Sequence, residues 1–237
     1  MAAVQERSGR RSQVEEFQPR ILLQPIAAPS VLGYFGLCSS LLIYGTYIAG
    51  SWGQASSPEY FFFFVAAFGG IGQLGAALWS YSARDATAAS IHGAWGALWL
   101  GWGVMWLMAT AGLITIPAIG THFAPFGMWM IYMGVITLTT AFAALARSPG
   151  IALALLVLTA ATAIDASALL YGSPGLTHWA GWLFVAAAAA VFYVGAALMI
   201  DNVYGFTALP LLRWRRQGPA EPAAVWEHGD PGVKVGQ

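Results

Sequence analysis

Six long apolar stretches follow one another along the chain, separated by short polar or glycine-containing segments. Each is about 20 residues long, which at a rise of about 1.5 Å per residue is enough to cross about 30 Å of hydrocarbon. They are apolar at odd and even positions alike, whereas a membrane β-strand alternates. The pattern therefore predicts an all-α membrane protein with six transmembrane helices. These lie near residues 30–51, 58–81, 86–109, 126–147, 149–171 and 178–201.

Local chemistry indicates where four of these helices begin. Ser57 and Ser148 each precede a proline, so the serine hydroxyl can accept a hydrogen bond from the first turn while proline takes the first helical position. Asp85 and Thr177 can cap the third and sixth helices in the same way.

Composition agrees with a location in the lipid bilayer. Apolar residues make up 58% of the 237 positions and charged residues only 8%, against about 25% charged residues in soluble domains. The net charge is zero and no basic stripe is present, so we expect no nucleic-acid partner.

The basic residues divide the chain into two sides. They occur before the first helix, between the second and third, between the fourth and fifth, and after the sixth, and in no other loop. The positive-inside rule therefore predicts that both termini lie in the cytoplasm, for a multi-pass protein of the inner (plasma) membrane. We expect a mobile cytoplasmic tail over 1–25, a transmembrane domain over 26–211 and a cytoplasmic tail over 212–237. The basic residues are Arg7, Arg10, Arg11, Arg20, Arg84, Arg147, Arg213, Arg215, Arg216 and Lys234.

A glycine-rich segment in the second helix matches the pattern of a dinucleotide-binding loop. Residues 70–75 read G-I-G-Q-L-G, but that loop needs a preceding strand and a soluble βαβ unit. In a transmembrane helix, small residues instead let a neighbouring helix approach closely. We therefore interpret Gly69, Gly70, Gly72 and Gly75 as packing residues.

Four tryptophans form a stripe on the third predicted helix. Trp95, Trp99, Trp102 and Trp106 recur at i, i+4, i+7 and i+11, which places them on one narrow face. A lipid-facing or subunit interface and a pore wall would both use such a stripe. The pattern alone favours the interface, with Trp95, nearest to the middle of the membrane, as the exception.

Three polar residues within the helices are candidates for a polar pathway or for proton coupling. A bare carboxylate at Asp165 would cost several kcal/mol, so it must face water, find a partner or be protonated. The alternative is a packing role through a hydrogen bond to Ser167 or to a neighbouring helix. Gln73 and His92 also need partners, for which structural hydrogen bonds are favoured over substrate contact. Asp201, at the end of the sixth helix, is expected to be solvated.

The chain offers little for catalysis or metal binding. Its one cysteine, Cys38, cannot form an intrachain disulfide, and the histidines have no metal-ligand spacing. The predicted spans contain no lysine for a Schiff base, and no nucleophile elbow is present. We therefore predict no cofactor, no metal and no enzyme activity.

Six segments, in order and spacing, resemble the acetate uptake transporter family of the succinate-acetate permease type. The resemblance covers about residues 26–211. The segments are APSVLG at 28–33, FGGIGQL at 68–74, AWGALW at 94–99, GVITL at 134–138, HWAGW at 178–182 and YGFTALP at 204–210.

This resemblance implies a homo-hexamer in which each protomer carries its own anion pathway, with a hydrophobic constriction at mid-depth. By position the constriction residues would be Leu37, Trp95 and Leu158, with Trp95 standing where a tyrosine is usual.

The family's entrance motif, N-P-A-P-L-G, keeps only Pro29, Leu32 and Gly33 here. Ala28 replaces the asparagine and Val31 the second proline, so a substrate hydrogen bond at that asparagine would be lost. The polar cluster late in the first helix is replaced by the segment Y-G-T-Y at residues 44–47.

The sequence thus predicts a transporter or channel for acetate and other small mono- and dicarboxylates, with proton coupling left open. The predicted interior has hydroxyl and indole donors but no arginine or lysine, so binding should be weak and passage quick. Two alternatives stay open. One is a channel for neutral solutes such as urea or a short amide, and the other is a non-transporting membrane subunit of a larger complex.

Overall fold

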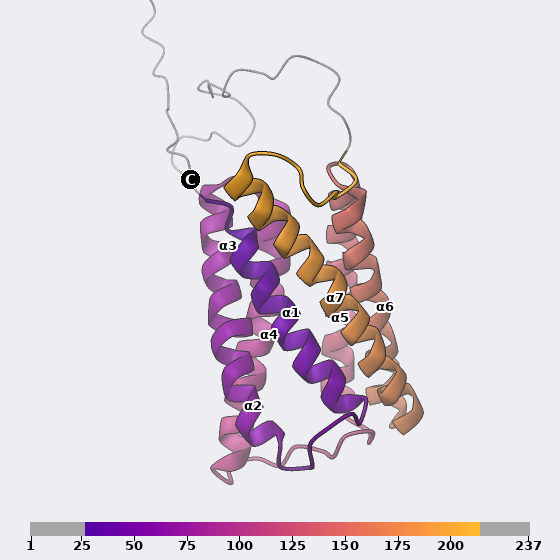
Figure 1. Cartoon of the computed structure of the whole chain (residues 1–237). Helices are drawn as coiled ribbons and strands as arrows, with labels where there is room; N and C mark the ends of the chain where they lie inside the picture. The colour runs from indigo at the N-terminus through magenta and orange to yellow at the C-terminus, as the bar shows by residue number, and fades with distance from the viewer. Residues whose placement is uncertain (1–26, 214–237) are drawn as a thin grey trace, which may run out of the picture. The chain divides into compact units, whose positions relative to one another are not determined.

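A computed structural model describes residues 27–213, which form helices joined by short connections (Figure 1). Six helical rods follow one another, in agreement with the six predicted helices, and no strand occurs between residues 27 and 213. The second rod is continuous but contains a π-helix. The helices are α1 (Ser30–Ile48), α2 (Pro58–Phe64), the π-helix η1 (Val65–Gly72), α3 (Gln73–Ser82), α4 (Ala86–Thr110), α5 (Ala124–Leu145), α6 (Pro149–Tyr171) and α7 (Pro174–Tyr204).

Five of the six rods are long and apolar enough to cross a membrane, counting α2, η1 and α3 as one rod. The sixth rod, α4, has 25 residues, which at 1.5 Å per residue is about 37 Å. The mean hydropathy of α4 is lower because the helix is rich in tryptophan and glycine, which contribute little on hydropathy scales. The chain is thus an all-α, multi-pass membrane protein. The predicted tails, 1–25 and nearly all of 212–237, lie outside the described residues.

The rods pack as a closed ring in chain order. Each rod contacts the next one along the chain, and α7 returns to pack along α1 (Figure 1). Because the number of rods is even, α1 begins and α7 ends at the same end of the ring. We call this the proximal end and the opposite one the distal end. The basic side chains between residues 27 and 213 are Arg84, Arg147 and Arg213, and all three lie in proximal segments.

Two of the predicted helix caps are present. The Asp85 carboxylate accepts a hydrogen bond from the Ala88 N–H at 3.0 Å, and the Ser148 hydroxyl accepts one from the Ile151 N–H at 3.3 Å. Both satisfy backbone donors that the first turn of a helix leaves free.

The other two predicted caps are wrong. The Ser57 hydroxyl accepts from the Gln54 N–H at 2.8 Å, so it closes the preceding loop instead of capping α2. The last helix begins at Pro174, one turn before the predicted start at residue 178, and its cap is Ser173 instead of Thr177. Ser173 and Pro174 carry the same serine-proline signal that identified the cap at Ser148.

The glycine-rich segment of the second rod packs closely against its neighbours, as predicted. A Cβ atom on Gly70 would lie 3.0 Å from the backbone nitrogen of Leu100 in α4, and one on Gly69 would overlap the Ser40 hydroxyl of α1. Gly75 differs, because nothing lies within 4 Å of its Cβ position. A Cβ on Gly72 would meet only the Phe68 ring of the same rod. The prediction of close packing against a neighbouring helix therefore holds for Gly69 and Gly70 and is wrong for Gly72 and Gly75.

The chain after α7 folds back across the proximal ends of α6 and α7. The Ser148 hydroxyl donates to the Leu211 carbonyl at 2.7 Å, and the Arg213 guanidinium lies 3.1 Å from the Asp201 carboxylate. The expectation that Asp201 is solvated is wrong, since only 12% of its side chain is exposed and it has an ionic partner.

Candidate functional site

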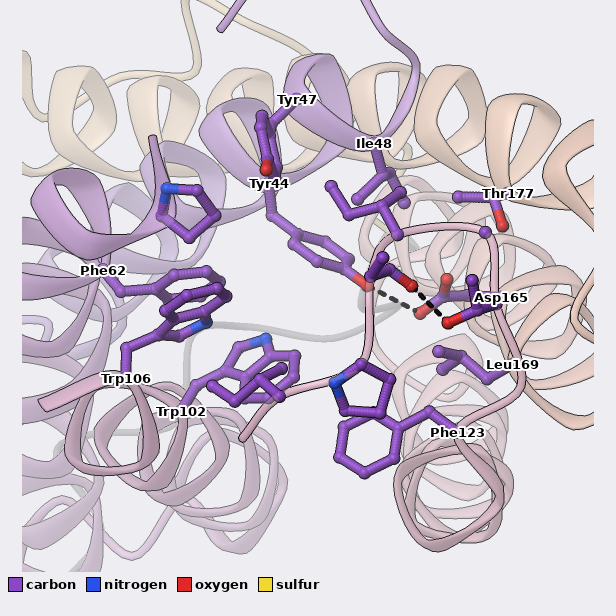
Figure 2. Close-up of a pocket in the computed structure, with 17 residues that line it drawn as sticks. Tyr44, Tyr47, Ile48, Phe62, Trp102, Trp106, Phe123, Asp165, Leu169 and Thr177 are labelled. Carbon is purple, nitrogen blue, oxygen red and sulfur yellow. Dashed lines mark hydrogen bonds between the residues drawn. The ribbon is translucent and has the colours of Figure 1, made fainter. Parts of the chain in front are cut away.

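Two cavities enter the ring from opposite ends. The distal cavity, of about 60 Å³, lies among the distal ends of the rods and the segment that joins α4 to α5 (Figure 2). The proximal cavity, of about 270 Å³, lies among the starts of α1, α4 and α6 and the ends of α5 and α7. The candidate site consists of these two cavities and the path through the protein interior between them.

A tyrosine and a carboxylate face each other in the distal cavity. The Tyr44 hydroxyl of α1 donates to Asp165 Oδ2 of α6 at 3.1 Å (Figure 2), and only 1% of Asp165 is exposed. Asp165 therefore has a neighbouring helix as its partner, one of the alternatives left open above. The Ser167 hydroxyl, the other alternative, donates to the Ala163 carbonyl instead.

Aromatic rings form the opposite wall of the distal cavity. Trp102 and Trp106 of α4 line it together with Phe62 and Phe123, and Phe62 stacks on Trp106 with ring centroids 5.7 Å apart. The indole nitrogens of both tryptophans are buried and have no hydrogen-bond partner among residues 27–213. The cavity thus combines one acidic group with unpaired N–H donors.

The proximal cavity contains the start of the predicted entrance motif. Pro29 lines it, next to Tyr34 of α1. Arg147, from the α5–α6 connection, reaches Asp85 at 3.8 Å, with side chains 70% and 35% exposed. Arg147 and Asp85, which both line the cavity, thus place a solvated pair of opposite charges at this mouth.

The three predicted constriction residues lie between the cavities. Leu37, Trp95 and Leu158 are all 0% exposed, and they stand seven, nine and nine residues from the starts of α1, α4 and α6. A rise of 1.5 Å per residue puts them at similar depths, roughly 10 to 14 Å from the proximal end. The interior is therefore filled at mid-depth, and the line between the cavities is closed in this structure.

One hydrogen bond holds the largest of these side chains. Trp95 Nε1 donates to the Thr137 hydroxyl of α5 at 3.1 Å, and that hydroxyl donates to the Met133 carbonyl at 2.7 Å. The indole is thus fixed across the interface of α4 and α5. Thr137 belongs to the family-like segment GVITL at 134–138, but nothing in the sequence indicated its hydrogen bond to Trp95.

Gln73 and His92 line neither cavity and lie in the packing between the second rod, α1 and α4. The Gln73 amide donates to the Gly69 carbonyl at 2.8 Å. His92 is fully buried with Tyr34 edge-on at 4.9 Å, and neither ring nitrogen has a hydrogen-bond partner among residues 27–213. The expectation of a structural hydrogen bond is therefore correct for Gln73 and wrong for His92.

The remaining two entrance-motif residues differ in environment. Leu32 is 47% exposed on the outer surface of α1. Gly33 packs against His92, because a Cβ there would come within 2.5 Å of the imidazole ring. Only Pro29 of the three reaches the proximal cavity.

The tryptophan stripe faces the inside of the ring, so the preference for a lipid or subunit interface is wrong. Trp95, Trp99 and Trp102 are 0%, 1% and 9% exposed. The ring closes around this face of α4, which the sequence pattern could not show. The sequence also missed Tyr44 as the partner of Asp165, although its spacing from Leu37 places both on one face of α1.

Comparison with known proteins gives consistent matches. Residues 14–214 match the model of the GPR1/FUN34/yaaH family. The succinate-acetate/proton symporter SatP of Escherichia coli K12 is 26% identical over 144 residues, which are 61% of this chain and 74% of that protein. The protein of the same name from Shigella flexneri matches equally well. The solved structure of the bacterial acetate channel SatP superposes with a TM-score of 0.70 at 23% identity, covering 79% of this chain and 99% of that one, which is a likeness of fold.

Proposed function

Because the chain belongs to the GPR1/FUN34/yaaH family, we propose that it is a membrane transporter or channel for acetate and other small mono- and dicarboxylates. The names of the relatives supply the substrate class, since they are described as a succinate-acetate/proton symporter and an acetate channel. The observation that carries the proposal is the pair of cavities that enter one helix ring from opposite ends.

The proposed route runs through the centre of each protomer. At the proximal mouth an anion meets Arg147, paired with Asp85; among residues 27–213 it is the only basic side chain that lines either cavity. Further along, the donors are hydroxyl and indole groups, so the route offers hydrogen bonds without a fixed positive charge. Shape and dehydration then set selectivity, binding is weak, and release is fast.

Passage requires the constriction to open. Leu37, Trp95 and Leu158 must move apart, and Trp95 is the residue whose displacement breaks a hydrogen bond. We therefore propose Trp95 as the gate and Leu37 and Leu158 as its apolar partners. An apolar gate of this kind admits only a solute that sheds most of its water.

The three polar candidates take different proposed roles. Asp165 lines the distal cavity, so it is the candidate for proton coupling. Gln73 and His92 line neither cavity, so we assign them to packing between the second rod, α1 and α4. Pro29 and Gly33 shape the proximal start of α1.

The protein is further proposed to act as a homo-hexamer in the inner (plasma) membrane, with both termini in the cytoplasm and no enzymatic activity. Large apolar side chains on the second rod face outward and suit lipid or a neighbouring copy. Phe63 and Trp79 are 73% and 60% exposed. The proximal position of the three described arginines supports a cytoplasmic proximal end.

A substrate panel in proteoliposomes tests the proposed function. Labelled acetate, propionate, succinate and urea are offered at alkaline pH, where little undissociated acid leaks through lipid, and uptake into protein-free liposomes is subtracted. We expect protein-dependent acetate uptake that other small carboxylates inhibit. Uptake of urea without uptake of any carboxylate would instead identify a neutral-solute channel.

A further inference from the structure

Building on the proposed transport route, we infer that the distal cavity is a binding site for a small neutral group that carries one hydrogen-bond donor beside one carbonyl acceptor. An undissociated carboxylic acid and a primary amide share this chemistry. The site would therefore accept acetic acid in its protonated form and also acetamide, an amide substrate class that the names of the relatives do not include.

The acidic wall of the cavity requires a donor from its ligand. Asp165 accepts one hydrogen bond, from Tyr44, and no lysine or arginine of the described range, 27–213, lines the cavity. The only other titratable side chains in the lining are Tyr44 and Tyr47, and neither brings a positive charge. A second carboxylate beside Asp165 would thus meet an uncompensated like charge in a dry site, where two such groups cannot both be ionised. A bound carboxyl group and Asp165 must therefore share at least one proton.

The aromatic wall requires an acceptor. Trp102 lines the cavity and is 9% exposed. Its indole N–H is buried and has no hydrogen-bond partner among residues 27–213. The Trp106 N–H is in the same situation. An unpaired buried donor is unfavourable, and a hydrogen bond to a ligand carbonyl would remove this cost. Figure 2 shows the two indoles and Asp165 on different sides of the space.

The size and lining of the cavity limit the ligand. Its volume of about 60 Å³ holds only a few waters, since one water needs roughly 10–15 Å³. Apart from the groups above, its walls include Ile48, Phe62 and Phe123. A second charged carboxylate, as in succinate, would lie against these apolar side chains. The distal cavity is thus a site for one carboxyl or amide group on a short apolar stem.

The test is equilibrium binding to the purified full chain in detergent, measured by calorimetry with acetamide and with acetate. Wherever the empty site holds an ionised Asp165, acetamide is expected to bind with an affinity that does not change with pH. Acetate should bind with one proton taken up wherever the empty site holds an ionised Asp165, so its affinity should fall about tenfold per pH unit there. N,N-dimethylacetamide, which keeps the carbonyl but lacks the N–H donor, should not bind.

Two variants localise the effect. Asp165→Asn should make acetate affinity independent of pH, because an amide can donate to the carboxylate directly. It should also weaken acetamide binding by about tenfold, since a hydrogen bond to a charged acceptor is roughly twice as strong as a neutral one. Trp102→Phe should weaken both ligands. Asp201→Asn, which removes a carboxylate far from the cavity, is the matched control and should behave like the parent. Gel filtration checks that each variant is folded.

The outcomes separate this site from the transport function. Two results would overturn the site and leave the transport function intact. The first is acetate uptake in liposomes without any binding of acetamide. The second is acetate uptake together with the same pH dependence of acetate binding in Asp165→Asn and the parent. Acetamide binding that responds to Asp165→Asn, together with no carboxylate uptake, would support the site and overturn the proposed function. Equal binding of acetamide and N,N-dimethylacetamide would also overturn the site.

Discussion

The indole of Trp95 shows how one hydrogen bond can position a large side chain at the middle of the proposed route. Its N–H reaches the Thr137 hydroxyl at 3.1 Å, and both residues are fully buried. The bond joins α4 to α5, so displacement of the ring is resisted by the loss of a partner for a buried donor. The stability of the closed route therefore depends on Thr137 as well as on the constriction residues themselves.

Removing that acceptor should destabilise the protein measurably. Thr137→Val replaces the hydroxyl by a methyl group of similar size and leaves the Trp95 N–H unpaired, which is expected to cost about 1–3 kcal/mol. Thr137→Ser keeps the hydroxyl and is the control. Thermal unfolding in detergent, followed by gel filtration, compares them. Equal midpoints for the two variants would show that the bond contributes nothing to stability.

At the residue scale, the sequence predicted which buried polar side chains need a hydrogen-bond partner better than it predicted which residue is that partner. That Asp165 requires a partner follows from the cost of a carboxylate in hydrocarbon, but Tyr44 lies 121 positions away, and only the packing of α1 against the other helices brings them together. The same holds for Trp95 and Thr137. For His92 the predicted need itself was not met. Neither nitrogen of its ring has a hydrogen-bond partner among residues 27–213.

The second rod shows how one helix can use glycines in different ways along its length. Gly70 lies in the π-helix η1 with the backbone of Leu100 at 3.0 Å from its Cβ position, whereas the Cβ position of Gly75 in α3 is open. Close approach of α4 thus covers the π-helical part and extends into the start of α3, where a Cβ on Gly96 of α4 would lie 3.0 Å from the backbone nitrogen of Leu74. The wider turn of a π-helix is often found at functional sites.

Alanine at these two glycines should have opposite effects. Gly70→Ala must push α4 away from the second rod and is expected to lower the thermal unfolding temperature. Gly75→Ala meets no atoms and removes a flexible residue from a helix, so it should be neutral or stabilising by about 0.5–1 kcal/mol. Thermal unfolding of both variants in one detergent gives the comparison. Destabilisation of the same size in both would contradict the packing argument.

At the element scale the sequence predicted the number, order and approximate bounds of the helices, because length and apolar character decide what crosses a membrane. Helix starts were less certain. Asp85 and Ser148 cap as predicted, while Ser57 bonds to the preceding loop. A serine before proline can cap the helix that follows or close the loop that precedes it, and the path of the loop determines which of the two occurs. The π-helix left no recognisable signal, since its glycines suit close packing in an ordinary helix equally well.

At the scale of the whole molecule, the closed ring determines which face of each helix points to the interior. The helices are apolar around most of their circumference, so the sequence could not show which face looks inward. The ring settles this for α4, whose tryptophans fill the interior. It also produces two cavities at opposite ends with a filled segment between them. A transport route through the ring, as proposed, therefore has to pass the side chains of this filled segment.

Labelled-carboxylate uptake by proteoliposomes that contain Trp95→Ala or Trp79→Ala tests this gate most directly. Trp79 lies on the outside of the second rod, 60% exposed, so it controls for the loss of a tryptophan. Acetate, propionate and butyrate are compared at alkaline pH, with protein-free liposomes subtracted and folding checked by gel filtration. An apolar contact can discriminate about tenfold per methylene, and Trp95→Ala should sharply reduce the preference for acetate while Trp79→Ala keeps it. Identical uptake and chain-length preference in Trp95→Ala and the parent would contradict a route past Trp95.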